Sequence, residues 1–240
     1  MNESLAHHRT DIRSKTALDR NATATPAELA TGIETCDQAA GLSAIHDPGT
    51  GLVIWKRAFP LCLQRWIEQL DSACLPDLRV LVRPIDLRRA IEPKLDDCGT
   101  PPGDMRDLLI GDVVDLVTVF SKVAATDLVD VRLESISHDA CWKFHRDCVE
   151  ARFLTTYRGP GTEWVRPAQA EQALREQTDF NGPAEHVDVH DGVLFKGSCA
   201  GPGIGIVHRS PPIAGTGNTR LLLCLNKPSV TSPAPWSSAG

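Results

Sequence analysis

The apolar pattern changes its period near residue 130, and this change constrains the fold more than any other feature. Before it, apolar residues recur every three to four positions at residues 61–70, 85–95 and 104–120, as on the buried face of an amphipathic helix. After it, apolar and polar residues alternate in short segments separated by Gly- and Pro-rich turns, which is typical of β-sandwiches and barrels. Helices followed by strands predict an α+β fold, with N-terminal helices packed on a C-terminal sheet.

Six short segments beyond residue 130 follow the strand pattern. They are residues 131–136, 153–157, 187–189, 193–195, 204–207 and 221–225. The longest helix is expected to follow Gly103 with Asp104 as its N-cap, because a carboxylate there accepts hydrogen bonds from free backbone N–H groups.

Composition divides the chain into four parts. Residues 1–40 are polar and aperiodic and are expected to form a flexible leader, and the Pro-, Ser- and Ala-rich residues 228–240 a flexible tail. Between them, residues 41–130 are predicted to be mainly helical, and residues 131–227 to form a strand-rich, metal-binding part.

Charge and hydropathy argue against several classes of protein. The net charge is −6 and the Lys and Arg residues are scattered, whereas a nucleic-acid-binding surface normally carries a basic stripe. No apolar run approaches the roughly 18 residues of a membrane span, and the N-terminus has no apolar signal segment. The eight cysteines form no CxxC pair, which favours free thiols in a reducing compartment. We therefore expect a cytoplasmic protein that binds neither nucleic acid nor membrane, and the oligomeric state stays open.

One cluster of metal-binding residue types stands out. His145 and Asp147 form an HxD pair, and residues two apart in a strand point to the same face of a sheet. His208, 61 residues after Asp147 at the end of an expected strand, supplies a third ligand. Two imidazoles and one carboxylate leave three coordination positions open, the arrangement of non-haem Fe(II) oxygenases. Cys148 alternates with the pair and is expected to face away from the metal and to be buried.

Arg220 is a candidate for binding an anion. It follows His208 by 12 residues and opens the apolar strand 221–225. Its guanidinium can form a two-pronged pair with a carboxylate deep in a barrel. The alternative is that Arg220 only caps the edge of the strand, and the sequence does not decide between the two.

The order of these motifs resembles a known family. The HxD pair, the strand Arg152–Tyr157, the strand Gly192–Phe195, His208 and Arg220 follow one another as in 2-oxoglutarate/Fe(II) dioxygenases of the prolyl-hydroxylase-like branch. The resemblance covers residues 131–226 and implies a double-stranded β-helix, that is, a cupin-like barrel.

The resemblance also implies roles for individual residues. Fe(II) is bound by His145, Asp147 and His208. The carboxylate of 2-oxoglutarate is bound by Arg220, with help from a tyrosine after the HxD pair, which here is Tyr157.

Lys196 departs from the oxygenase pattern. It stands where these enzymes commonly have an apolar strand end. It is expected to be solvated, as most lysines are, and the alternative is a second cation for the cosubstrate.

Two longer strings resemble a more specific family. FHRDCVEARFLTTYRGPGTEWV and LFKG…GIVHRSPP are similar to the uncharacterised bacterial family called domain of unknown function 1826. The resemblance suggests a setting among zinc-homeostasis genes, which implies Zn(II) as an alternative metal.

Three functions follow from these observations. The first is an Fe(II)- and 2-oxoglutarate-dependent oxygenase that hydroxylates an unknown substrate. The second is a non-catalytic, cupin-like zinc-binding protein linked to metal homeostasis, with Cys148 as a fourth ligand. The third is an interaction module that keeps the fold and binds no metal. Imidazole and carboxylate accept several divalent metals, so the sequence alone does not name the ion.

Overall fold

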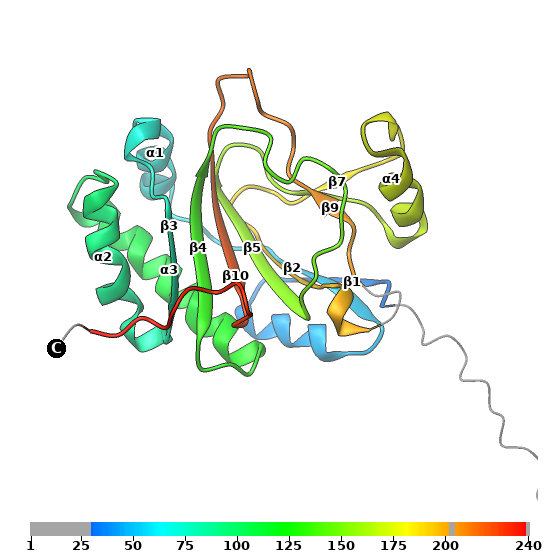
Figure 1. The fold of residues 1–240 in the computed structure, drawn as a ribbon, viewed down its shortest axis with the longest axis horizontal. Coiled ribbons are helices and arrows are strands. Elements are labelled where there is room, and N and C mark those ends of the chain that lie inside the picture. The colour runs from blue at the N-terminus through cyan, green and yellow to red at the C-terminus, as the bar shows by residue number, and fades with distance from the viewer. Residues whose placement is uncertain (1–29, 202–204, 239–240) are drawn as a thin grey trace, which may run out of the picture.

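The computed structural model describes residues 30–201 and 205–238, and a seven-stranded sheet forms the centre of this part of the chain (Figure 1). Its order is β1-β2-β8-β5-β10-β4-β3, and all neighbours are antiparallel except β1 and β2, which are parallel. These strands are β1 (Gly32–Cys36), β2 (Thr50–Trp55), β3 (Leu78–Val82), β4 (Val129–Ile136), β5 (Ala151–Arg158), β8 (Gly192–Lys196) and β10 (Arg220–Asn226). A smaller sheet has the order β7 (Glu185–His186), β6 (Glu163–Trp164) and β9 (His208–Arg209).

The helices differ in length and kind. The α-helices are α1 (Leu61–Gln69), α2 (Leu87–Asp97), α3 (Asp104–Val123) and α4 (Ala170–Glu176). Short 3-10 helices are η1 (Ala39–His46), η2 (Ser72–Cys74), η3 (Pro84–Asp86), η4 (Pro167–Gln169), η5 (Gln177–Asp179) and η6 (Ser198–Ala200).

Different layers cover the two faces of the large sheet. Helices α1, α2 and α3 lie on one side, which we call the helix face, and the small sheet and α4 lie on the other, which we call the site face (Figure 1). On the helix face, Phe153 and Leu223 belong to one apolar core with Phe120 of α3. On the site face, Phe195 belongs to a second core with Trp164 of the small sheet. The protein is therefore a mixed α/β fold built on a largely antiparallel sheet.

Strand β10 contributes to both cores. Leu221, Leu223 and Leu225 lie in the core of the helix face, whereas Leu222 and Cys224 lie in the core of the site face. A strand buried on both faces reads as a continuous apolar run, because neither set of alternating residues meets water. The backbone of β10 pairs with β4 on one side and with β5 on the other.

The three helices expected before residue 130 are present, with two local differences. Gly103 caps α3 with φ 131°, a conformation open to glycine at little steric cost, so Asp104 is the first helical residue and not the N-cap. The second helix, expected over residues 85–95, begins at Leu87 and continues past Pro93 to Asp97.

Strands are found at four of the six expected places, and these are β4, β5, β8 and β10. Residues 187–189 instead follow the two-residue strand β7, and residues 205–207 precede β9. Residue 204 lies outside the described residues.

The two chain ends differ from the expected leader and tail where the structure describes them. Strand β1 and the first two residues of η1 lie within the expected leader, and β1 pairs with β2. Residues 1–29 of that prediction lie outside the described residues. Near the other end, Pro235 forms a bridge to Leu81 of β3, and the Trp236 N–H donates to the Leu81 carbonyl at 2.7 Å. Strands β2 and β3 also lie in the part that was expected to be mainly helical.

The expected closed barrel is not found in the described part of the chain. There the large sheet ends in β1 and β3, and the two-residue strands of the small sheet form a separate sheet that pairs with neither edge. Within residues 30–201 and 205–238, no helix has both the length and the apolar character that a membrane span requires.

The packing of residues 235–236 on β3 predicts that they stabilise the fold. Trp236 is partly buried against the core of the helix face, and the Arg89 guanidinium lies 5.3 Å from its ring centroid. We expect Trp236→Ala to lower the free energy of unfolding by about 1–2 kcal/mol, measured by urea denaturation. Val230, which is fully exposed, provides the control, because Val230→Ala removes no buried contact. Equal stability of both variants and the parent would contradict a structural role for this segment.

Candidate metal centre

His145 and His208 are paired through their backbones. The N–H of each donates to the carbonyl of the other, both at 3.0 Å, in an isolated antiparallel bridge. His208 begins β9. His145 and Asp147 lie in the connection between β4 and β5, so the prediction that they share a regular strand is wrong. Ser198 holds Asp147 in place, because its N–H and its hydroxyl donate to the Asp147 carbonyl at 2.8 and 3.1 Å.

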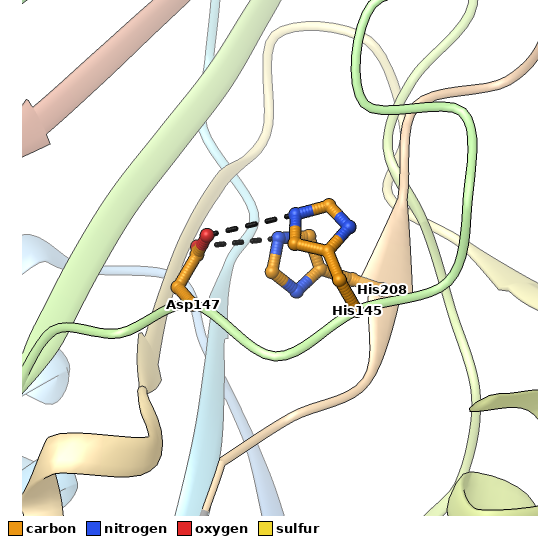
Figure 2. A group of neighbouring side chains, drawn as sticks. All are labelled: His145, Asp147 and His208. Atoms are coloured by element: carbon orange, nitrogen blue, oxygen red, sulfur yellow. Dashed lines mark ion pairs between the residues drawn. The ribbon is translucent and has the colours of Figure 1, made fainter.

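The three side chains converge on one point. His145 Nε2 lies 3.6 Å from Asp147 Oδ1, and His208 Nε2 lies 3.3 Å from Asp147 Oδ2. One ligand atom of each residue lies within 4.8 Å of the others, and Figure 2 shows both imidazoles facing the carboxylate. Two atoms that each lie about 2.0–2.2 Å from one ion are at most about 4.4 Å apart, so both His–Asp distances suit a shared metal.

Backbone carbonyls fix the tautomers of the two histidines. His145 Nδ1 lies 2.7 Å from the Lys143 carbonyl, and His208 Nδ1 lies 3.1 Å from the Ile206 carbonyl. A carbonyl only accepts, so each Nδ1 carries the hydrogen, and in the neutral ring Nε2 holds the lone pair that binds metals. Both Nε2 atoms are thus available to one ion.

One carboxylate oxygen of Asp147, Oδ2, is buried without a hydrogen-bond partner among the described residues. A buried polar atom without a partner costs free energy, and lone pairs of neutral imidazoles facing a carboxylate repel it. A divalent cation among the three side chains removes both problems, so the residues fit a metal ion.

The charges around Asp147 shift the pKa values of the site. Burial is the largest single influence on Asp147 and raises its pKa, but the two imidazoles and the Arg152 guanidinium outweigh it, and the net pKa lies well below the usual range. The Asp147 carboxylate in turn raises the pKa of His145, against an opposing effect of burial. Asp147 is therefore ionised, and His145 holds a proton at pH values where an ordinary imidazole has lost it.

Arg152 is part of the site, and the sequence analysis missed it. Its Nη1 lies 2.6 Å from Asp147 Oδ1, and its Nε donates to the Asn226 side-chain carbonyl at 2.7 Å. The sequence feature that could have identified Arg152 was its position near the start of β5. Side-chain alternation there puts it on the same face of the sheet as Leu154. Arg152 orients the carboxylate and balances part of its charge.

The cluster borders a cavity of about 270 Å³. Both histidines line it, and most of the other side chains there are polar or charged. They include Asp77, Arg132, Glu134, Ser135, His138, Cys141, Arg152, Thr162 and Ser210. The candidate metal site is thus open to a space that can hold a small polar molecule.

Arg220 lies behind the wall of this cavity. Its side chain is fully buried, and its Nη1 donates to the Ser210 hydroxyl at 2.6 Å and its Nη2 to the Thr162 hydroxyl at 3.4 Å. Its Nε donates to the Pro160 carbonyl at 2.8 Å, and no carboxylate of the described residues lies within ion-pair distance. Burial lowers the pKa of Arg220 to about 10. The guanidinium therefore carries a buried charge with neutral partners only among the described residues. The Ser210 and Thr162 side chains, which line the cavity, separate it from that space.

The structure separates Tyr157 and Lys196 from the cluster. Tyr157 is fully buried on the helix face, where its hydroxyl donates to the Asp112 carboxylate of α3. Lys196 shares the side of β8 that Leu194 occupies, also on the helix face, and donates to the Asp47 carbonyl at 2.8 Å. The cosubstrate role that the resemblance implies for Tyr157, and the alternative role of Lys196 as a second cation, do not fit these positions, because both side chains leave the sheet on the helix face.

Cys148 is exposed, so the expectation that it is buried is wrong. Its Sγ lies 3.4 Å from the Sγ of Cys199. It is not one of the residues whose ligand atoms converge in the described metal cluster.

Fold and site together define a mixed α/β protein with a two-histidine, one-carboxylate cluster that can hold a metal ion. The chain belongs to the family "Protein of unknown function (DUF1826)", whose model matches residues 36–226. This match confirms the resemblance carried by the two long strings around the HxD pair and His208.

Other comparisons add little. No curated protein matches the sequence. Among solved structures, the chain is similar to "Crystal Structure of AviO1 from Streptomyces viridochromogenes Tue57", with 12% identity, 84% of this chain and 99% of that chain covered, and a TM-score of 0.35. Identity and score at this level carry no argument about the function of this chain.

The raised pKa of His145 makes metal binding depend on pH. An ion that uses His145 Nε2 must displace its proton, so we expect the affinity for a divalent metal to fall as the pH falls below the raised pKa. The decrease should be about tenfold per pH unit for each proton displaced. Calorimetric titration in buffers of different ionisation enthalpy measures the protons released. An affinity that stays constant between pH 5 and 8, with no proton release, would contradict binding through the imidazoles.

Proposed function

We propose that the chain is a non-haem Fe(II)- and 2-oxoglutarate-dependent oxygenase that hydroxylates a substrate not yet identified. His145, Asp147 and His208 hold the Fe(II). The observation that carries the proposal is the pair of imidazoles whose Nδ1 atoms are fixed by carbonyls and whose Nε2 atoms face one buried carboxylate beside a polar cavity. Fe(II), 2-oxoglutarate and O₂ together supply the oxidative chemistry in such enzymes.

The number of ligands favours a site open to small molecules. Structural zinc sites almost always have four protein ligands and are closed, whereas the described residues bring together three. The cavity that His145 and His208 line gives a cosubstrate room to approach the open positions. The protein then binds and orients the metal and the cosubstrate. Arg152 holds the carboxylate of Asp147, and Ser198 holds its backbone carbonyl.

Arg220 supports the cosubstrate part of the proposal. A buried cation with neutral partners is costly, and a bound carboxylate would balance its charge. In the proposal, one carboxylate of 2-oxoglutarate lies against the Ser210 and Thr162 hydroxyls, with the Arg220 guanidinium directly behind them. Arg152 is the competing partner, because it lines the cavity itself.

The proposal includes a double-stranded β-helix as the type of fold. In its favour, the metal ligands lie between the two sheets. His208 begins β9 of the small sheet, and its ring centroid lies 4.6 Å from that of Phe195 on β8 of the large sheet. We also place the protein in the cytoplasm, where its eight cysteines are expected to be reduced.

Zinc binding without catalysis is the second candidate, because the same donor set accepts Zn(II). A structural zinc ion would contribute its binding free energy to folding, so a chelator would then lower the melting temperature. Melting and turnover therefore separate the two functions.

Asp147→Ala tests the oxygenase. The variant loses the only anionic ligand, and we expect it to release no succinate from 2-oxoglutarate under Fe(II) and O₂, whereas the parent does. The fold should survive, since both apolar cores are intact. Thermal melts with and without chelator accompany the assay.

Asp188→Ala is the matched control, because Asp188 is exposed and its one ion pair among the described residues is with Lys56, away from the cluster. It should keep the turnover and melting temperature of the parent. A parent protein that makes no succinate and melts far lower in chelator is a zinc protein, and the oxygenase proposal is then wrong.

Arg220→Lys tests the cosubstrate site. Lysine keeps the charge but not the planar fork, so we expect the affinity for 2-oxoglutarate to fall about tenfold to hundredfold, measured by calorimetry on the metal-loaded protein. Arg175→Lys on the exposed face of α4 serves as the control, because Arg175 is 70% exposed. If Arg152→Lys weakens binding and Arg220→Lys does not, Arg152 is the clamp and the assignment to Arg220 fails.

A further inference from the structure

Two cysteines outside the metal cluster lie in contact. The Sγ atoms of Cys148 and Cys199 are 3.4 Å apart, and both residues are exposed. They are 51 positions apart in the sequence. Since a disulfide bond is about 2.0 Å long, the sulfurs need to approach by little more than about 1 Å to form one.

The backbone segments that carry these cysteines are hydrogen-bonded to each other. The N–H groups of Gly197, Ser198 and Cys199 donate to the carbonyls of Glu150, Asp147 and Val149 at 3.0, 2.8 and 3.1 Å. Residue 197 must be glycine for this approach, because a Cβ there would lie 2.3 Å from the Val149 carbonyl oxygen. The two segments are therefore held side by side in the reduced protein, and the sulfurs meet with little movement of the backbone.

We propose that Cys148 and Cys199 are a redox-active pair that closes to a disulfide when the protein meets a peroxide or a small disulfide oxidant. The two thiols lose two protons and two electrons as the S–S bond forms. With hydrogen peroxide the O–O bond breaks and two waters leave, and with oxidised glutathione two molecules of reduced glutathione leave. A dithiol reductant reverses the reaction.

The position of the pair links it to the candidate metal centre. Cys148 follows Asp147 directly, and the Asp147 carbonyl is bound by Ser198, the residue before Cys199. The disulfide adds a covalent bond between these two segments and so restrains the backbone that carries the carboxylate ligand. We infer that oxidation slows the exchange of the bound metal, a part of the proposal that rests on the proposed metal site, whereas the disulfide itself does not.

Peptide mapping tests the disulfide. Trypsin releases Cys148 in the peptide DCVEAR (Asp147–Arg152) and Cys199 in the peptide GSCAGPGIGIVHR (Gly197–Arg209). After treatment with hydrogen peroxide and blocking of free thiols, we expect a species that joins these two peptides and is two hydrogen atoms lighter than their sum. A reductant should separate it. Two of the eight thiols should be lost to titration.

Three variants control the experiment. Cys148→Ser and Cys199→Ser should each abolish the joined species and the coupled loss of two thiols. Cys62→Ser should leave both unchanged, because Cys62 is exposed but has no sulfur neighbour among the described residues. Separate oxidation of Cys148 and Cys199 to sulfinic acids, or a cross-link that forms only between two chains, would overturn the proposal.

Metal release tests the link to the metal centre. The probe is Zn²⁺ alone, transferred from the loaded protein to a chromogenic chelator, before and after oxidation. Release should be slower from the oxidised parent, and oxidation should have no effect in Cys199→Ser, which leaves the residue beside Asp147 intact. Equal rates from oxidised and reduced parent would overturn the link. A parent that binds no Zn²⁺ and no Fe(II) would overturn the proposed function, and the joined peptide would still decide the disulfide.

Discussion

Burial of β10 on both of its faces is the constraint on which the two halves of the structure depend. Its leucines alternate between the core under α3 and the core beneath the small sheet. The strand can be enclosed in this way because its backbone pairs with β4 on one side and β5 on the other, and buried N–H and carbonyl groups need such partners. The position of Arg220 at the start of this strand explains how a guanidinium comes to be fully buried next to the site.

A second constraint is the buried charge of Asp147. A carboxylate that is 7% exposed requires nearby positive charge, and the structure provides Arg152 on Oδ1 and the two imidazoles across both oxygens. Without metal, a proton on His145 completes the balance, which is why the pKa of that imidazole is raised. A divalent ion replaces the proton and uses the same lone pairs. Proton and metal therefore compete for one site, and the surrounding carbonyls, which orient both rings, serve either occupant.

The sequence predicted those elements whose apolar period is strong. The three helices and the strands β4, β5, β8 and β10 each carry several apolar residues in register, and these were found. Strand β1, with the sequence GIETC, has no such pattern, because it is a partly exposed edge that gains its stability from pairing with β2. Backbone contacts made by residues 235 and 236 with Leu81 leave no trace in composition either. The triad was recognised from its residue types, although the strand geometry assumed for the HxD pair was wrong.

Tyr157 and Arg152 show why the remainder of the site was hidden. Both lie on β5, and side-chain alternation puts them on opposite faces of the sheet. Because Phe153 and Leu154 are both buried, one in each core, the apolar pattern of this strand does not tell which face holds the metal. The HxD pair gives no help, since it lies outside the regular strands. One known contact, such as that of Arg152 with Asp147, shows which alternating positions of the central strands face the metal cluster. Arg152, Phe195 and Arg220 then fall on the site face, and Tyr157 and Lys196 fall on the helix face. Within these central strands, further residues that touch a substrate are therefore to be sought at the positions that share the face of Arg152, Phe195 and Arg220.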